Sequence, residues 1–396
     1  MIVGPCFVVS GGRSPQVLED GGVRVVGAHI AQVARIATLA ASHPEETLWP
    51  ARGRVLIPGL VNSHAHLARH LARGLGLENR DEWRRYDDAL APEDIHWSAM
   101  AALVEGVRHG VTTLCDLHRS ANCLDLSLSE LTGAADRLGV RLATGYAAGE
   151  DDSPLIRAAA RRESLGLAAD LERRRQGRLR GLAGVHATSL AGLGTLLDET
   201  RATGGEIPLH IELDLDLDRS AERWREPRLA PGGVVLWAHA ERAPAGLIER
   251  ARARGDALSS SRAQPEAAHE EFAWGSDSGL NAPPLPDGLD TAAEDYYRRV
   301  WVNGAEWGAR HFGEGLGLIE PGAPADLVLL DYAPPTELDG RTLWPHLVHG
   351  LARARVSGVM VAGEIVMDHG QLTTVDEMEV AARARECARR VWAKLG

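Results

Sequence analysis

Lysine, aromatic residues and cysteine are all scarce in this chain of 396 residues. Lys394 is the only lysine, so nearly all of the 43 basic residues are arginines. Aromatic residues make up 5% of the sequence, which leaves Ala, Leu and Val to build the core. The four cysteines include no CxxC pair and are too few for a disulfide framework, so we expect reduced thiols.

Long hydrophobic runs are also missing. No stretch of about 18 apolar residues is present, and the amino terminus lacks the basic and apolar regions of a signal peptide. We therefore expect a cytoplasmic protein with no membrane partner. The 55 acidic residues outnumber the 43 basic ones and give a net charge of −12, which argues against nucleic acid as a partner.

Short apolar runs alternate with amphipathic segments through residues 58–314, and this alternation predicts parallel strands joined by crossover helices. The first predicted strand ends at His64, and the others cover 111–117, 140–146, 181–187, 207–213, 233–239, 256–260 and 272–277. The predicted helices cover 94–109, 126–138, 155–176, 189–203, 219–226 and 243–254. Eight such units close into a TIM-like (β/α)8 barrel, so the fold class is α/β. The segment 261–271 is too short for a good helix and makes the seventh unit the weakest.

Two β-prone regions rich in glycine flank the predicted barrel. Residues 1–57 and 315–370 are expected to pair as one small composite β-sandwich domain built from both chain ends. The barrel, with the chemistry, would occupy residues 58–314. The remaining segment, 371–396, contains an amphipathic helix.

The candidate chemistry lies at the ends of the predicted strands. His64 and His66 are two residues apart, so both imidazoles can point to one face of a strand. His210 lies in the fifth strand, His239 ends the sixth and Asp277 ends the eighth. Since the carboxyl ends of barrel strands surround one mouth, these side chains predict a site for a divalent metal such as zinc or iron(II).

Several motifs resemble the amidohydrolase superfamily: PGLVNSHAH (58–66), GVTTLCD (110–116), VLWAHAE (235–241), WGSD (274–277) and IEPGAPADLVLLD (319–331). The likeness is strongest to the cytosine deaminase and chlorohydrolase branch, and within it to the SsnA-type aminohydrolases. It covers nearly the whole chain. It implies a distorted (β/α)8 barrel with a small composite β-domain.

The resemblance also implies roles for individual residues. The ligands of one divalent metal ion, zinc as first choice and iron as the alternative, would be His64, His66, His210 and Asp277. His239 would contact the attacking water and the substrate, and Asp277 would join it in moving protons. His186 would contact the substrate, with Arg73 and His118 as further pocket candidates.

The fifth strand departs from the family pattern His-x-x-Glu. The residue three positions after His210 is Leu213, and if Glu212 takes the place of the family's second histidine, the corresponding residue is Leu215. Neither alignment keeps the glutamate that shuttles a proton to the leaving group. Glu212 or Asp214 is the candidate to replace it, although aspartate is shorter and proton transfer requires hydrogen-bond reach.

The resulting hypothesis is a cyclic amidine deaminase, a hydrolase of carbon–nitrogen bonds in which water activated by the metal attacks a small nitrogen heterocycle. Hydrolysis of a C–N or C–Cl bond without deamination is a variant of it. The alternative is a catalytically degenerate barrel that acts as a binding or scaffold subunit. The resemblance further implies a homodimer.

Overall fold

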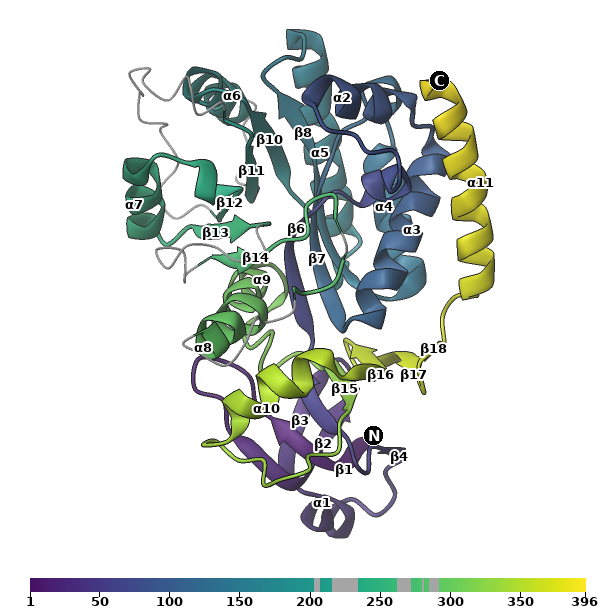
Figure 1. The fold of residues 1–396 in the computed structure, drawn as a ribbon, viewed down its shortest axis with the longest axis vertical. Coiled ribbons are helices and arrows are strands. Elements are labelled where there is room, and N and C mark those ends of the chain that lie inside the picture. The colour runs from purple at the N-terminus through teal and green to yellow at the C-terminus, as the bar shows by residue number, and fades with distance from the viewer. Residues whose placement is uncertain (203–206, 216–233, 262–271, 280, 285–291) are drawn as a thin grey trace.

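The computed structural model describes residues 1–396 except 203–206, 216–233, 262–271, 280 and 285–291. The described chain forms two sheets. Helices pack around the larger sheet (Figure 1). The predicted helix 219–226 and most of the predicted connection 261–271 lie outside the described residues.

The larger sheet is a parallel barrel of eight strands, as predicted. In spatial order they are β6 (Leu60–Ala65), β7 (Val111–His118), β8 (Arg141–Gly149), β10 (Ala183–Ala187), β11 (Leu209–Leu213), β12 (Val235–Ala238), β13 (Ala257–Ser260) and β14 (Ala273–Trp274). A short strand, β9 (Leu179–Gly181), pairs with β8. The eighth strand is shorter than predicted, and the barrel closes through a bridge between Ala65 and Asp277.

Helices cover the outside of the barrel because their apolar faces pack on the strands. They are α3 (Pro92–Arg108), α4 (Ser127–Leu138), α5 (Pro154–Arg173), α6 (Leu190–Ala202), α7 (Ala245–Arg254), α8 (Ala292–Tyr297) and α9 (Gly304–Phe312), with a π-helical turn at Arg298–Asn303. Short 3-10 helices lie at Leu67–Ala72, Ala121–Cys123, Ala240–Arg242 and Leu351–Arg353. A further helix, α2 (Arg80–Ala89), was not predicted, and a capping box of Asn79 and Glu82 begins it.

The smaller sheet joins the two chain ends. Its order is β18 (Gln371–Leu372), β17 (Glu364–Asp368), β16 (Arg355–Val361), β15 (Leu327–Asp331), β5 (Val55–Pro58), β1 (Ile2–Val9), β2 (Val17–Val26) and β3 (His29–Arg35), with β4 (Leu48–Pro50) paired to β1. Two short helices, α1 (Ile36–Ser42) and α10 (Leu343–His349), accompany it. Figure 1 shows this sheet below the barrel. Only Gly59 separates β5 of this sheet from β6 of the barrel.

The barrel and the smaller sheet are joined by a buried ion pair. Arg141 at the start of β8 donates to both carboxylate oxygens of Asp326, at 2.7 and 2.9 Å. The same carboxylate accepts the backbone N–H of Ala362 at 2.8 Å. Its buried charge is therefore neutralised and hydrogen-bonded, which is the condition for tolerating such a pair.

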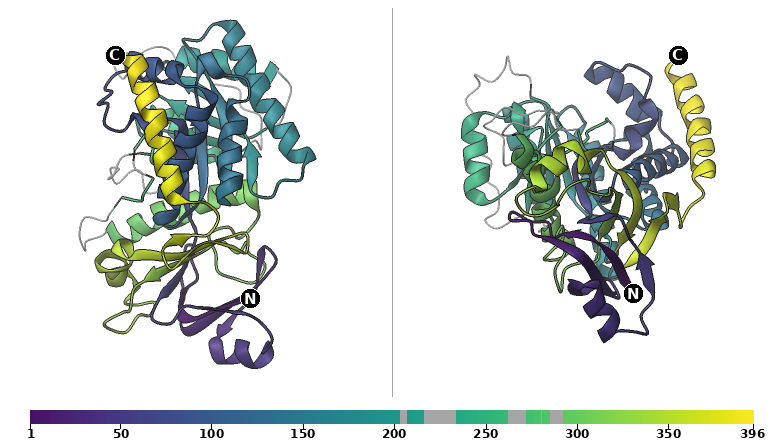
Figure 2. Two further views of the ribbon diagram at one scale, coloured as in Figure 1. Left: turned by 90° about the vertical axis from the view of Figure 1, so that its right-hand side faces the viewer. Right: turned by 60° about the horizontal axis from the view of Figure 1, so that its bottom comes forward.

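The carboxyl-terminal helix α11 (Glu377–Leu395) lies along the outside of the barrel beside α3 (Figure 2). It is held by Arg390, which pairs with Asp94, and by Trp392, whose indole N–H donates to the Leu71 carbonyl at 2.8 Å. The four cysteines form no disulfide. Among the described helices none is both long and apolar enough to cross a bilayer.

Candidate metal centre and active site

Strand β6 delivers the first two histidines to the carboxyl end of the barrel. His64 lies in the strand and His66 directly follows it, and both are buried. The strand end is anchored by the closing bridge, since Asp277 donates its N–H to the His64 carbonyl and accepts the His66 N–H, both at 3.0 Å. The bridge therefore places Asp277 beside the two imidazoles.

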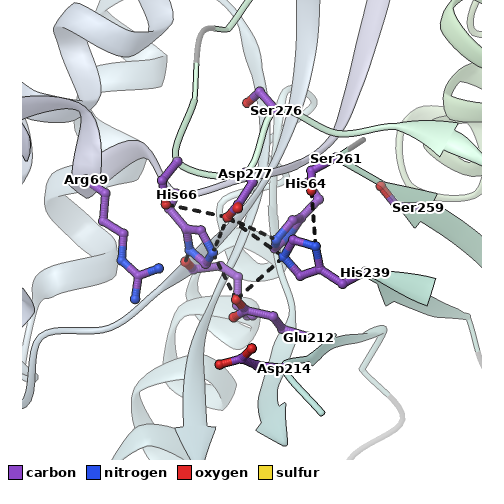
Figure 3. A network of polar contacts seen from close by, with 12 residues as sticks. His64, His66, Arg69, Glu212, Asp214, His239, Ser259, Ser261, Ser276 and Asp277 are labelled. Atoms are coloured by element: carbon purple, nitrogen blue, oxygen red, sulfur yellow. Dashed lines mark hydrogen bonds and ion pairs between the residues drawn. The ribbon is translucent and has the colours of Figure 1, made fainter. Parts of the chain in front are cut away.

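Four side chains converge at this point (Figure 3). The Nε2 atom of His66 lies 3.3 Å from Glu212 Oε1 and 3.3 Å from Asp277 Oδ1. His64 Nε2 lies 4.0 Å from Asp277 Oδ1. One donor atom from each of His64, His66, Glu212 and Asp277 lies within 4.8 Å of all the others, so this group can hold one metal ion.

His210 lies behind this group. Its Nε2 atom is 2.9 Å from Nδ1 of His64, on the side of the ring that faces away from Asp277. The structure thus brings His64, His66 and Asp277 together as expected, but it places Glu212 beside them where the resemblance implied His210. His210 and Glu212 are both inward residues of β11, and Glu212 is the one nearer the carboxyl end.

His239 faces the same group from the end of β12. Its Nε2 atom lies 3.9 Å from Glu212 Oε1 and 3.8 Å from Asp277 Oδ1. Its Nδ1 atom lies 3.2 Å from the Ser261 hydroxyl and 3.7 Å from the Glu241 carboxylate. Both His239 and Asp277 have a positive φ, 53° and 54°, and such strained backbone is typical of functional sites.

The carboxylates and imidazoles shift each other's pKa values. Burial disfavours the charged form of His66, but the Glu212 and Asp277 carboxylates outweigh it and raise the pKa of His66 to about 10. Burial also opposes ionisation of Glu212 and Asp277, yet the surrounding imidazoles hold the pKa of each carboxyl below its usual range. For His64, burial and the neighbouring His66 lower the pKa, so this imidazole is neutral and able to coordinate.

A cavity of about 380 Å³ opens above the cluster. Its lining includes Glu212, His239 and Asp277 from the cluster, and also Arg69, Arg80, Trp83, Arg84, Asp87, Arg119, His186, Asp214 and Arg242. The arginines and Trp83 were not predicted as pocket residues, although the run EWRR (82–85) after the first barrel strand contains two of the lining residues, Trp83 and Arg84. Helix α2, which was not predicted, contributes Arg80, Trp83, Arg84 and Asp87 to the wall of the cavity.

Asp214, a candidate for proton transfer, is bound by two arginines. Arg80 donates to Asp214 Oδ2 at 2.8 Å, and Arg242 donates to Oδ1 at 2.6 Å. Arg80 also donates to the Asp214 backbone carbonyl at 2.8 Å. We call these three residues the arginine clamp; it joins the start of α2 to the end of β11.

His186 presents a defined hydrogen-bonding face to the cavity. Its Nδ1 atom lies 3.0 Å from Nη1 of Arg119, and Arg119 is held in turn by Asp152 at 2.9 Å. A guanidinium only donates, so His186 Nδ1 accepts and the proton of the neutral ring is on Nε2. Burial lowers the pKa of His186 to about 4, which keeps the ring neutral near pH 7.

The two weaker pocket candidates lie elsewhere. Arg73 pairs with Glu105 at 2.7 Å and is half-exposed outside the cavity lining. His118 is buried at the end of β7, where its Nε2 atom lies 2.7 Å from the Ser120 hydroxyl. Neither residue is among the described residues that line the cavity.

Comparisons with known proteins agree with this geometry. Residues 55–218 match the amidohydrolase family, a range that contains His64, His66 and Glu212. The match covers less than half of the chain, from β5 to just beyond β11, so over this part the chain is similar to amidohydrolases. The chain is 26% identical to a 5-methylthioadenosine/S-adenosylhomocysteine deaminase of Natronomonas pharaonis over 389 residues, which covers 85% of this chain and 87% of the relative. A 5'-deoxyadenosine deaminase of Methanosarcina mazei is 23% identical, and the match covers 96% of this chain and 94% of the relative.

Solved structures show the same fold. An adenosine deaminase from Xanthomonas campestris with bound zinc superposes with a TM-score of 0.74 at 20% identity, over 99% of this chain and 98% of the other. Atrazine chlorohydrolase from Arthrobacter aurescens, complexed with zinc, superposes with a TM-score of 0.74 at 18% identity, over 98% and 99%. The overall fold of this chain is therefore common to both.

Proposed function

We propose that this protein is a metal-dependent amidohydrolase, a deaminase that releases ammonia from an amino group on a small aromatic nitrogen heterocycle, with aminopurines as the first choice. The observation that carries the proposal is the convergence of His64, His66, Glu212 and Asp277 at the carboxyl end of the barrel. The related deaminases of 5-methylthioadenosine and 5'-deoxyadenosine support the choice of an aminopurine.

The donor chemistry fits a divalent cation. His64 Nε2 and Glu212 Oε2 are buried and have no hydrogen-bond partner among the described residues. Leaving such atoms unpaired costs free energy, which a bound cation would recover. The residues that would hold the cation are His64, His66, Glu212 and Asp277, and a cation there would lower the pKa of a water molecule towards 7. Zinc is our first choice, since both superposed structures hold it, with iron(II) as the alternative.

The protein groups that can move protons are His239 and Asp277. Both face the cluster and line the cavity, within reach of a substrate bound there. The family's strand-five glutamate has no counterpart, because the two positions at which it could align are occupied by Leu213 and Leu215. Leu213 is buried in the hydrophobic core and Leu215 packs against it. We infer that Asp277 accepts the proton of the attacking water and that His239 assists the departure of ammonia.

His186 supports a heterocycle as the substrate. Its Nε2–H, held in that tautomer by Arg119, is a donor that suits a ring nitrogen with a free lone pair. Trp83 contributes an aromatic surface to the same cavity, and the Arg69 guanidinium lies 4.9 Å from its ring centre. A planar, nitrogen-rich ring matches both features.

The decisive experiment is a coupled ammonia assay on a panel of aminopurines, aminopyrimidines and aminotriazines, with protein loaded with Zn²⁺ or Fe²⁺. We expect at least one substrate whose turnover is lost on chelation and in the His64→Ala variant. Chloride release from chlorotriazines without ammonia would support the hydrolytic variant, to which the likeness to atrazine chlorohydrolase points. No turnover of any compound, with tight binding of a heterocycle, would support the binding-subunit alternative that the missing glutamate suggests.

The closer likeness to the SsnA-type aminohydrolases, the homodimer, the cytoplasmic location and the domain boundaries remain predictions. Size-exclusion chromatography with light scattering would test the homodimer directly.

A further inference from the structure

The fifth barrel strand carries two side chains that could each bind a metal, and their environments differ. We propose that Glu212 is the ligand that β11 contributes to the metal centre, and that His210 instead acts as the hydrogen-bond acceptor that positions His64. The inference rests on the proposed function for the presence of a divalent cation. It adds which residues hold the cation and which cations they favour.

The first argument is distance. Donor atoms bound to a tetrahedral ion at about 2.0–2.2 Å lie roughly 3.3–3.6 Å from one another. Glu212 Oε1 and Asp277 Oδ1 each lie 3.3 Å from His66 Nε2. The second Glu212 oxygen is buried without a partner among the described residues. Glu212 thus stands at ligand spacing and has an unused donor atom.

The second argument is proton placement on the histidines. For His66 the Leu117 carbonyl lies 2.6 Å from Nδ1, and a carbonyl only accepts, so Nδ1 carries a proton. Nε2 is then the nitrogen that a cation would bind, in place of the proton that the neighbouring carboxylates favour there without a cation. For His64 the nitrogen facing the cluster is Nε2, which has no hydrogen-bond partner in the part of the chain that the structure describes. A free lone pair at that atom requires the proton on Nδ1, which then donates to His210 Nε2 at 2.9 Å.

The same argument excludes His210 from coordination through Nε2. With the His64 proton on Nδ1, the lone pair of His210 Nε2 is taken by the hydrogen bond from His64, and the proton of the His210 ring is on Nδ1, which is buried without a partner among the described residues. His210 therefore orients His64 from behind, as carbonyls and carboxylates do in other metal centres.

A carboxylate ligand from Glu212, in place of the imidazole that the resemblance implied, changes which metal ion the site prefers. Two carboxylates and two neutral imidazoles carry two negative charges, whereas one carboxylate and three imidazoles carry one. Carboxylate oxygens suit harder cations such as Mn²⁺, and imidazoles suit Zn²⁺. We expect the ratio of Zn²⁺ to Mn²⁺ affinity to be lower in the wild-type protein than in Glu212→His, by about tenfold or more.

The experiment measures metal binding rather than turnover. The full chain is stripped with a chelator and titrated with Co²⁺, whose visible absorption reports coordination. We expect about one equivalent in the wild type, a loss of affinity of about 1,000-fold or more in Glu212→Gln, and a loss of about tenfold or less in His210→Gln, whose amide oxygen can still accept from His64. Circular dichroism and thermal unfolding of the metal-free variants check that each one folds.

Asp214→Asn is the matched control, because it removes a carboxylate two residues further along the same chain segment without touching the donor group. Its Co²⁺ affinity should equal that of the wild type. The proposal is overturned if Glu212→Gln binds Co²⁺ as the wild type does, if His210→Gln loses as much affinity as Glu212→Gln, or if the wild type binds no Co²⁺. A Glu212-dependent metal site without deamination would instead refute the proposed function alone.

Discussion

Glu212 and Asp214 are two residues apart, yet their nearest partners differ in kind. The His186 imidazole lies 3.9 Å from Asp214, farther than either of its two arginines. Glu212 and its neighbour Asp277 face imidazoles, whose protons and lone pairs are exchangeable. Asp214 faces the guanidiniums of Arg80 and Arg242, which hold their protons at every accessible pH. The carboxylates in the histidine cluster can therefore change partner or charge during a reaction, while the carboxylate in the arginine clamp keeps the pocket wall in place.

The ion pair of Arg141 and Asp326 is a second example of the guanidinium type, far from the cavity. It differs from the arginine clamp in being almost fully buried, with side-chain exposures of 5% and 1%. The comparison thus predicts that carboxylates paired with histidine carry the activity and that carboxylates paired with arginine carry the stability.

The largest expected effect is at Asp277. Replacing it with Asn keeps the shape but removes a metal donor and a proton acceptor, so kcat/KM should fall by about 10⁴-fold or more. Steady-state ammonia release with saturating metal measures this. A loss below about tenfold would show that Asp277 has neither role.

The next effect concerns stability rather than activity. Arg141→Met leaves the buried Asp326 carboxylate without its cation, so the free energy of unfolding should fall by about 3 to 5 kcal/mol while kcat/KM changes little. Urea unfolding measures it. The double variant Arg141→Met with Asp326→Leu should recover part of the loss, and an Arg141→Met protein as stable as the wild type would contradict the comparison.

His311 provides a contrast to the histidines that face carboxylates, since it is a buried histidine with no carboxylate partner among the described residues. Burial, with Arg180 and Arg310 adding to it, lowers its pKa from 6.5 to about 4. Below pH 6.5 the unfolded chain therefore binds a proton that the folded chain takes up only near pH 4. The free energy of unfolding consequently decreases as the pH is lowered from 6.5 towards 4.

Replacing His311 by Phe removes this titration. Between pH 7 and pH 5 the variant should lose about 2 kcal/mol less stability than the wild type, because only the unfolded wild-type chain gains the proton. Urea unfolding at the two pH values checks the difference. Parallel curves for the two proteins would show that His311 is not buried as a neutral ring.

The smallest effect is expected at Asp214. In Asp214→Asn the two arginines of the clamp lose their shared charge, but the donor cluster is untouched, so kcat/KM should fall about tenfold, mainly through KM. A kcat loss as large as that of Asp277→Asn would identify Asp214 as a proton carrier and would remove the distinction between the two kinds of carboxylate.

Arg119→Met tests the preference for the substrate, and its expected effect is about as large as that of Asp214→Asn. Without the guanidinium, the His186 ring is free to take either tautomer, so the preference for a heterocycle with a ring nitrogen at that position over its carbon analogue should fall about tenfold. Inhibition constants for the matched pair of ring compounds measure the preference. An unchanged preference would show that Arg119 does not control His186.

The parallel barrel was predictable from the sequence because hydrophobic periodicity is local, and strands and helices alternate clearly from β6 to β13. The His64 and His66 pair was predictable too, because both follow one apolar run. Helix α2 was missed, since its polar, arginine-rich sequence has only one apolar face, around Tyr86, packed on the barrel. The pocket arginines that it carries were missed with it.

The sequence alone determined the order of the elements, the inward face of β11 and the presence of two possible donors, His210 and Glu212, on that face, because a strand repeats every second residue. Which of the two reaches the cation depends on depth along the barrel axis and on the proton that His64 shares with His210. Only the tertiary structure decides this, because it brings together side chains that lie 146 positions apart in the chain.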